Sequence, residues 1–202
     1  MTLSAARVLT VRQPFASLIA LGVKTIEART WSTDYRGPLI IQAGARSFGG
    51  VNSTTAEMIR SWGLATCQRL RTGLGCDPED CYGYPLGAVV AVVDLVDCLP
   101  VEANRPIGEW AAPTRRIIAT EGSEGAFVAD VGSWGCWMAE EYEPTHFKWQ
   151  PAYCNGLLVP GAYGWLLDNP RRLEPIPHKG GLGLRHASDE LLAAVNQQLE
   201  AV

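Results

Sequence analysis

The densest group of polar side chains in the sequence lies between residues 22 and 31. Its members are Gly22, Lys24, Thr25, Glu27, Arg29 and Trp31. In an extended strand, side chains two residues apart point to the same face, so Glu27, Arg29 and Trp31 would line one side. A carboxylate on that face can hold a cationic side chain in place, and a tryptophan offers a plane on which a nucleobase can stack. The segment therefore indicates either a site for a planar polar ligand or a partly buried ion pair that only stabilises the fold.

Other catalytic arrangements find little support in the sequence. No serine lies in a G-x-S-x-G motif, and neither glycine-rich phosphate loop, G-x-G-x-x-G or G-x-x-x-x-G-K-[ST], is present. The six cysteines lack the paired C-x-x-C spacing of structural zinc sites, and we interpret them as reduced thiols. Residue types alone would allow a zinc ion between Cys67, Cys76, Cys81 and His146, but we expect no metal and no cofactor.

Charge is distributed unevenly along the 202 residues. The net charge is −4, from 17 basic and 21 acidic side chains. Residues 1–46 hold six basic and two acidic side chains, whereas residues 47–161 hold seven basic and fourteen acidic ones. This distribution excludes a uniformly basic nucleic-acid-binding surface, but it allows a local basic cleft for one nucleotide or a few phosphates.

The composition is that of an ordinary globular protein, with 47% hydrophobic and 19% charged residues. The longest apolar stretch, near Leu86–Val96, is well short of the roughly 20 residues that a membrane span needs. The first residues lack the basic and apolar regions of a secretory signal peptide. We therefore expect a cytoplasmic protein without a membrane attachment.

Hydrophobic periodicity and turn residues predict a mainly β protein with helical additions, of class α+β. Strands are expected at residues 7–12, 24–31, 39–43, 86–98 and 162–168, with 171–175 as a candidate for another. Helices are expected at residues 14–21 and 54–62, after a Ser188 cap at the C-terminal end, and as one or two short helices within 99–160. Short strands joined by many glycine and proline turns favour a small β-barrel, in which closure removes the exposed sheet edges.

The segment from Thr10 to Ala43 resembles the ASCH domain, whose hallmark G-x-K-x-x-E-x-R is present as Gly22, Lys24, Glu27 and Arg29. Three further blocks are similar to the subgroup related to the C-terminal domain of a eukaryotic transcription coactivator. These blocks are Gly87–Cys98, Tyr163–Leu167 and Pro177–Leu184. The resemblance implies a PUA-like β-barrel. We expect a single domain over residues 1–187, with insertions at about 44–85 and 99–160, followed by an amphipathic helix at 188–202.

The resemblance also implies a ligand. It implies binding of RNA, another single-stranded nucleic acid or a modified nucleoside in a cleft lined by Lys24, Glu27 and Arg29. The further residues that we expect there, for phosphate contact, polar contact and stacking, are Arg12, Gln13, Thr25, Trp31, Arg36 and Lys179.

Two alternatives stay open. Some small bacterial ASCH proteins are amidohydrolases that deacylate N4-acetylcytidine with a lysine and, three residues later, a threonine; others are ribonucleases. Here Lys24 matches the lysine but Glu27 occupies the threonine position, so a hydrolase would have to activate water with Lys24 and Glu27 as its catalytic pair. The acidic insertion at 99–160, which holds four tryptophans, could instead form a docking surface for a protein partner or a small core of its own.

Overall fold

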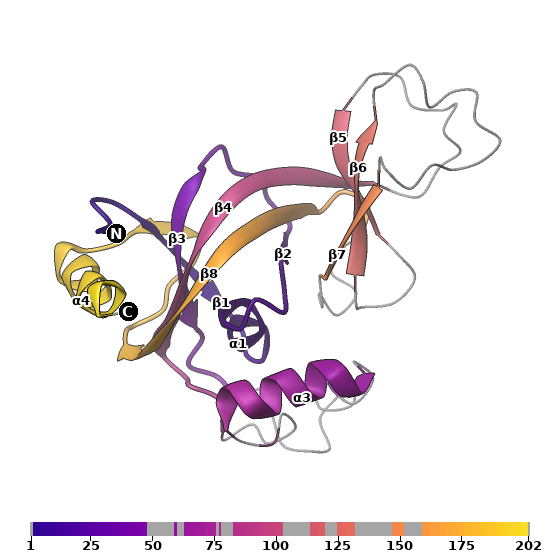
Figure 1. The fold of residues 1–202 in the computed structure, drawn as a ribbon. Coiled ribbons are helices and arrows are strands. Elements are labelled where there is room, and N and C mark those ends of the chain that lie inside the picture. Colours follow the sequence, from indigo (N-terminus) through magenta and orange to yellow (C-terminus); the bar gives the residue numbers. More distant parts are fainter. Residues whose placement is uncertain are drawn as a thin grey trace. The chain divides into compact units, whose positions relative to one another are not determined.

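The computed structural model describes residues 2–47, 59, 63–75, 77, 83–102, 114–119, 125–131, 147–151 and 159–201. The chain forms two compact units. Unit 1 comprises Met1–Lys24, Arg36–Val96 and Leu167–Val202, and unit 2 comprises Thr25–Tyr35 and Asp97–Leu166. Two long strands, β4 (Ala88–Glu102) and β8 (Tyr163–Pro177), contribute residues to both units (Figure 1).

Strands β1 (Arg7–Val11) and β3 (Gly37–Ala43) form the centre of unit 1. They run parallel, with Val8 opposite Ile40. β3 pairs antiparallel with β4, and β1 pairs antiparallel with the short strand β9 (Leu184–His186). The first six residues of β4 are all buried, as their near-continuous apolar sequence predicts for a strand that is covered on both faces.

Helix α1 (Phe15–Ala20) directly precedes the polar segment at residues 22–31. It buries Leu18 and Ile19 almost completely, as the predicted apolar stripe requires. The helix is closed by Gly22, which has a φ of +65° and donates its N–H to Ile19 O at 2.9 Å. The N–H of Lys24 donates to Leu18 O at 3.1 Å, so the backbone of this lysine is tied to α1.

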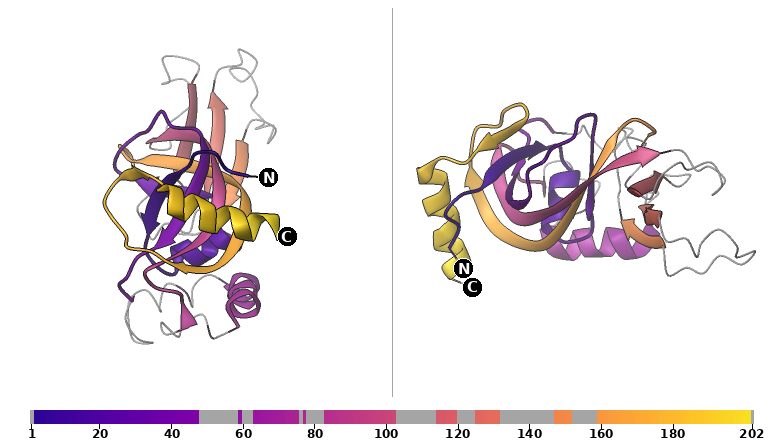
Figure 2. Two further views of the ribbon diagram at one scale, coloured as in Figure 1. Left: turned by 90° about the vertical axis from the view of Figure 1, so that its left-hand side faces the viewer. Right: turned by 90° about the horizontal axis from the view of Figure 1, so that it is seen from above.

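Helix α4 (Asp189–Glu200) packs on the strands of unit 1 (Figure 2). The Ser188 side chain accepts the N–H of Leu191 at 3.2 Å, which confirms the predicted cap. Leu191 and Val195 are buried in the apolar cluster that also contains residues of β1, β3 and β4. The N-terminal segment is joined to the helix by Asn196, whose side chain makes hydrogen bonds of 2.7 and 3.0 Å with the backbone of Leu3.

Unit 2 is organised around a different apolar cluster. Its strands are β2 (Ile26–Arg29), β5 (Thr114–Ala119), β6 (Gly125–Val131), β7 (Phe147–Pro151) and parts of β4 and β8. β2 pairs antiparallel with β8, β5 pairs parallel with β4, and β5, β6 and β7 follow one another antiparallel. The buried members of the cluster are Ile26, Ala28, Leu99, Val101, Ile117, Ala162 and Leu166. A Cβ atom on Gly164 would collide with the end of the Ile117 side chain, so a larger residue at this point of β8 would require the cluster to shift.

The predicted fold class, mainly β with helical additions, is confirmed. One prediction about the strands needs correction. The strands expected at 162–168 and 171–175 are one continuous strand, β8, because the positive φ of 49° at Asn169 does not end it. Between 99 and 160 the described residues include the end of β4 and strands β5 to β7, which pair with one another and with β4. The short helices expected in this segment would lie outside the described residues.

The second correction concerns helices. Helix α3 (Gly63–Leu74) is not among the helices expected from the sequence. Leu70 is the one buried residue among its described side chains, so the helix lacks a wide apolar face of the kind that periodicity detects. The expected helix at 54–62 lies outside the described residues except for Ile59, which is helical and buried. No helix among the described residues is long and apolar enough to cross a membrane.

Candidate functional site

The lysine of the polar segment is buried in unit 1. Lys24 is 2% exposed, and its ammonium nitrogen lies 5.7 Å from the centre of the Phe15 ring, within the range of a cation–π interaction. Gln13 is equally buried. Its Nε2 donates to Pro85 O at 2.8 Å, and its Oε1 accepts the N–H of Ser17 at 3.1 Å. Burying an ammonium group is costly, so the groups around Lys24 must compensate for the lost hydration.

The carboxylate and the guanidinium of the segment form an ion pair in unit 2. Arg29 Nη2 lies 3.0 Å from Glu27 Oε1, and the two side chains are 23% and 10% exposed. On β2, Glu27 lies opposite Trp165, which is fully buried, and Arg29 lies opposite Tyr163. Ile26 and Ala28, which alternate with the pair, lie in the apolar cluster, as the predicted two-residue period requires.

Two tryptophans meet beside this ion pair. The rings of Trp31 and Trp165 are 4.6 Å apart and nearly perpendicular, at 87°, which is the favoured edge-to-face arrangement. The Nε1 of Trp165 also donates to Trp31 O at 3.3 Å. Trp31 is half-buried, so part of its indole remains open to solvent. Unit 2 thus brings together Glu27, Arg29 and Trp31, three of the residues that the sequence selects.

The other predicted site residues differ in exposure. Thr25 is half-buried, whereas Arg12, Arg36 and Lys179 are exposed. The side chain of Gln13 holds Pro85 and the start of α1, which is a structural role that the sequence did not suggest. Ligand contact by these residues stays a prediction.

Comparison with known proteins places the polar segment within a match to a known family. The ASCH domain family matches residues 9–157, which is well over half of the chain. The chain belongs to the ASCH domain family. Two curated relatives are both called Activating signal cointegrator 1. The human protein is 38% identical and the mouse protein 36% identical, each over 91 residues that make up 45% of this chain. The matched region covers 14% of each relative, so the chain corresponds to a small part of their length. These matches confirm the predicted likeness to a coactivator-related subgroup.

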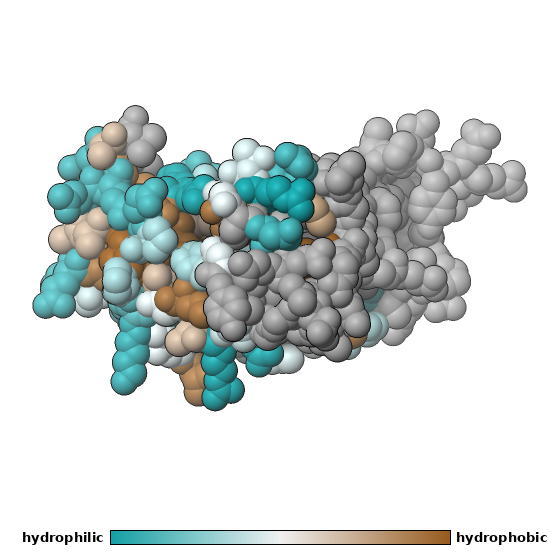
Figure 3. All heavy atoms as spheres, turned by 90° about the horizontal axis from the view of Figure 1, so that it is seen from below, coloured by the Kyte–Doolittle hydropathy of each residue, from teal (hydrophilic) through white to brown (hydrophobic). Residues whose placement is uncertain are grey.

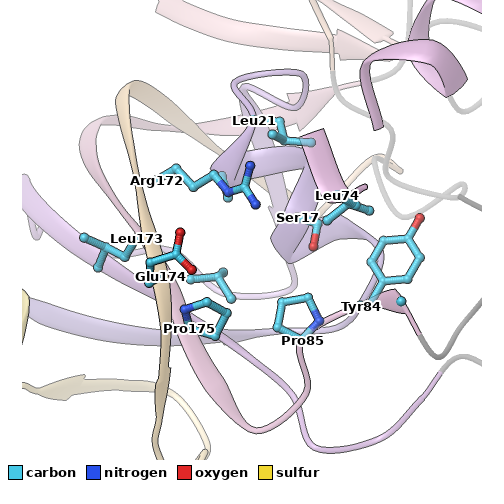
Figure 4. Close-up of a pocket in the computed structure, with 12 residues that line it drawn as sticks. Ser17, Leu21, Leu74, Tyr84, Pro85, Arg172, Leu173, Glu174 and Pro175 are labelled. Carbon is cyan, nitrogen blue, oxygen red and sulfur yellow. The ribbon is translucent and has the colours of Figure 1, made fainter. Parts of the chain in front are cut away.

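The ASCH domain also holds a cavity of about 380 Å³ that the sequence does not indicate. Its lining consists of Ser17, Ala20, Leu21, Leu74, Gly83, Tyr84, Pro85, Val90, Arg172, Leu173, Glu174 and Pro175, all in unit 1. Figure 4 shows Arg172 and Glu174 of β8 on one side of the hollow, with Tyr84 and Pro85 on another. Arg172 Nη1 donates to Gly73 O at 2.6 Å, so its guanidinium is hydrogen-bonded to α3. The cavity has no sequence signal because its lining comes from four separate segments.

The surface of the ASCH domain seen from below mixes hydrophilic and hydrophobic residues (Figure 3). Among the described residues, no group of three metal-ligating side chains gathers. Cys67 is half-buried and donates to Ile59 O at 3.4 Å, while Cys76, Cys81 and His146 of the possible zinc set lie outside the described residues.

Proposed function

We propose that this ASCH domain binds RNA or another single-stranded nucleic acid, or a modified nucleobase, at Glu27, Arg29 and Trp31 of unit 2. The observation that carries the proposal is the group on β2: an arginine held at 3.0 Å by a buried carboxylate, next to a half-buried tryptophan. The match of residues 9–157 to the ASCH family supports it.

The chemistry of this group suits a planar, polar ligand. Glu27 holds the guanidinium of Arg29 in one orientation, which lowers the entropy that a contact to a base edge or a phosphate would cost. The edge-to-face contact with Trp165 holds the Trp31 indole in the same way, and an indole fixed beside a cation is a stacking platform that tolerates any base. A chain with a net charge of −4 has little general attraction for polyanions, so specific contacts of this kind would have to supply the affinity.

Binding of a short single-stranded RNA, followed by fluorescence anisotropy, tests the proposal. We expect Trp31→Ala to weaken binding about 10-fold or more, because one base–aromatic stack contributes roughly 1–3 kcal/mol. Arg29→Gln should also weaken binding and reduce its salt dependence. Arg71→Gln is the matched control, because Arg71 is an exposed cation on α3 in the other unit.

Two outcomes would overturn the proposal. One is the absence of binding to RNA, single-stranded DNA and free nucleosides alike. The other is equal binding by Trp31→Ala, Arg29→Gln and the wild type, because the ion pair would then serve only the fold. A chromatographic time course with N4-acetylcytidine separates binding from turnover. Deacetylation that is lost in Lys24→Ala, in a protein that is still folded, would assign the site to an amidohydrolase instead.

A protein partner at residues 99–160 and residence in the cytoplasm stay predictions. The relatives named Activating signal cointegrator 1 match only part of the chain and are themselves matched over 14% of their length. Their roles therefore do not decide between the candidates.

A further inference from the structure

The arginine of β9 differs from two other half-buried arginines of the described chain. Arg185 has two guanidinium nitrogens, Nε and Nη2, that are buried without a hydrogen-bond partner among the described residues. Nε is buried without such a partner in Arg29 and Arg171 too, but in these two arginines Nη2 lies 3.0 and 2.6 Å from a carboxylate oxygen, so Arg185 differs from them at Nη2. Nε–H and Nη2–H lie on one edge of the guanidinium plane, and that edge matches two oxygens of a carboxylate or a phosphate. Burying charged donors without acceptors is costly, and an anion on this edge would recover the loss.

The glycine-rich loop between β8 and β9 holds this guanidinium against the backbone. A Cβ atom on Gly181 would lie 2.7 Å from Arg185 Nε, so the arginine packs directly on the glycine. The N–H of Gly181 donates to Thr10 Oγ1 at 3.2 Å, and Thr10 Oγ1 donates to Gln42 Oε1 at 2.6 Å. Because Gln42 is fully buried in β3, these bonds anchor the loop to the centre of unit 1. The loop therefore places a fixed backbone beside the guanidinium of Arg185.

Two positive charges, Lys179 and Arg185, lie in the segment around this loop. Residues 175–188 contain no acidic residue and lie between Glu174 and Asp189. His178 Nδ1 is also buried without a partner among the described residues. Burial, and secondly the charge of Arg185, lower the pKa of His178 below its usual 6.5, so this histidine is neutral at neutral pH. The positive charge of Arg185 is thus not balanced within this segment.

We propose that the β8–β9 loop is a phosphate-binding site, in which Nε and Nη2 of Arg185 donate to two oxygens of one phosphate group and Lys179 supplies a second positive charge. Lys179, Gly180 and Leu182 are exposed, so the loop lies at the surface, where a phosphate can approach. Since the two nitrogens are covered, binding requires a small shift of the Arg185 side chain away from Gly181. The site lies in unit 1 and uses neither Arg29 nor Trp31, so it stands or falls independently of the function proposed above.

Titration of inorganic phosphate into the full chain by calorimetry, in a phosphate-free buffer, tests this site. Arg185→Gln removes the donor edge, and Arg185→Lys keeps the charge but not the paired donors. We expect Arg185→Lys to lose about 10-fold in affinity, which is the effect of one lost charge-assisted hydrogen bond, and Arg185→Gln to lose more. Arg71→Gln, which removes an exposed cation of the same unit, should bind like the wild type.

A second variant preserves every charge. In Gly181→Ala the new methyl group would push the flexible end of Arg185 aside, so phosphate affinity should fall while the thermal unfolding midpoint stays near that of the wild type. The proposal is overturned if the wild type does not bind phosphate. It is also overturned if Arg185→Gln binds as well as the wild type, or if Arg71→Gln loses as much as Arg185→Gln, because the effect would then be general charge.

The source of the phosphate is distinguished by repeating the titration with a nucleoside, its 5′-monophosphate and a short single-stranded RNA. A gain from nucleoside to monophosphate that needs Arg185 identifies a nucleotide phosphate, and an Arg185 dependence seen only with RNA identifies the backbone of a nucleic acid. Phosphate binding that needs Arg185, together with no binding of RNA or nucleosides, supports this site and removes the proposed function. RNA binding that is lost in Trp31→Ala, together with phosphate binding that is unchanged in Arg185→Gln, supports the proposed function and overturns this phosphate site.

Discussion

Strands β2 and β9 each carry a half-buried arginine, but in opposite electrostatic settings. On β2, Arg29 lies 3.0 Å from Glu27, two residues before it on the same strand face, so the positive charge is largely balanced inside the protein. On β9, Arg185 forms no ion pair with a carboxylate among the described residues, and two of its nitrogens lack a hydrogen-bond partner there. The hallmark motif thus orients a cation by pairing it, whereas β9 holds a cation that lacks a partner within the described part of the chain and could take an external anion.

The largest expected effect on stability comes from removing the carboxylate that pairs with Arg29, which would make this arginine resemble Arg185. Replacing Glu27 with alanine leaves the Arg29 guanidinium partly buried without its carboxylate, and breaking such a pair costs about 2–4 kcal/mol. Urea unfolding measures the loss. The double variant Glu27→Ala, Arg29→Ala should recover part of it, because no buried charge remains unpaired. A loss below about 0.5 kcal/mol in the single variant would show that the pair behaves like a surface ion pair.

The two adjacent glycines of the loop offer a sharper contrast. A Cβ on Gly180 would lie 2.6 Å from Gln42 Oε1, and Gln42 is fully buried and hydrogen-bonded to Thr10. Gly180→Ala should therefore lower the free energy of unfolding by about 1–2 kcal/mol, because a buried hydrogen bond must break. Gly181→Ala should cost clearly less, because it meets the movable end of Arg185. Equal losses in thermal unfolding would show that Arg185 is as rigidly packed as Gln42.

Arg171 and Arg185 should contribute differently to stability, because Arg171 forms an ion pair and Arg185 forms none with the described residues. Arg171 Nη2 lies 2.6 Å from Asp94 Oδ1, and Asn169 Nδ2 donates to the other carboxylate oxygen at 2.9 Å. Arg171→Met should lower the free energy of unfolding by about 1 kcal/mol, since a partly exposed pair is lost. Arg185→Met should leave stability unchanged or raise it slightly, because two unsatisfied donors disappear. Chemical denaturation of both variants decides, and a larger loss in Arg185→Met would contradict the assignment of an unpaired guanidinium.

The smallest expected effect is on the pH dependence of His178. Its folded pKa is lowered, so between the ordinary value of 6.5 and the folded value the unfolded chain binds the proton more readily. The contribution of His178 to stability is therefore complete above pH 6.5 and is lost as the pH falls through the folded pKa. In Arg185→Met the pKa of His178 should rise, because the second cause of the shift is gone. Titration of the imidazole by NMR checks this, and an unchanged pKa would mean that burial alone lowers it.

Local patterns predicted the elements that are locally determined. The apolar run of β4, the stop at Gly22 and the Ser188 cap of α4 depend on neighbours in the sequence, and all three are present in the structure. Helix α3 and the continuity of β8 could not be predicted in this way. Leu70 is the one buried residue among the described side chains of α3, and β8 continues through Asn169 because pairing with other strands outweighs the local turn signal.

The sequence by itself determined the family motif and the two-residue alternation that places Glu27 and Arg29 on one face of β2, because both follow from backbone geometry over a few residues. Only the tertiary structure decided which charges are buried and which are balanced. The burial of Lys24 beside Phe15, the edge-to-face contact of Trp31 with Trp165 and the unpaired donors of Arg185 each join residues from separate segments. Desolvation and charge pairing depend on everything that folds around a group, so they are fixed by the packed chain and not by its neighbours in sequence.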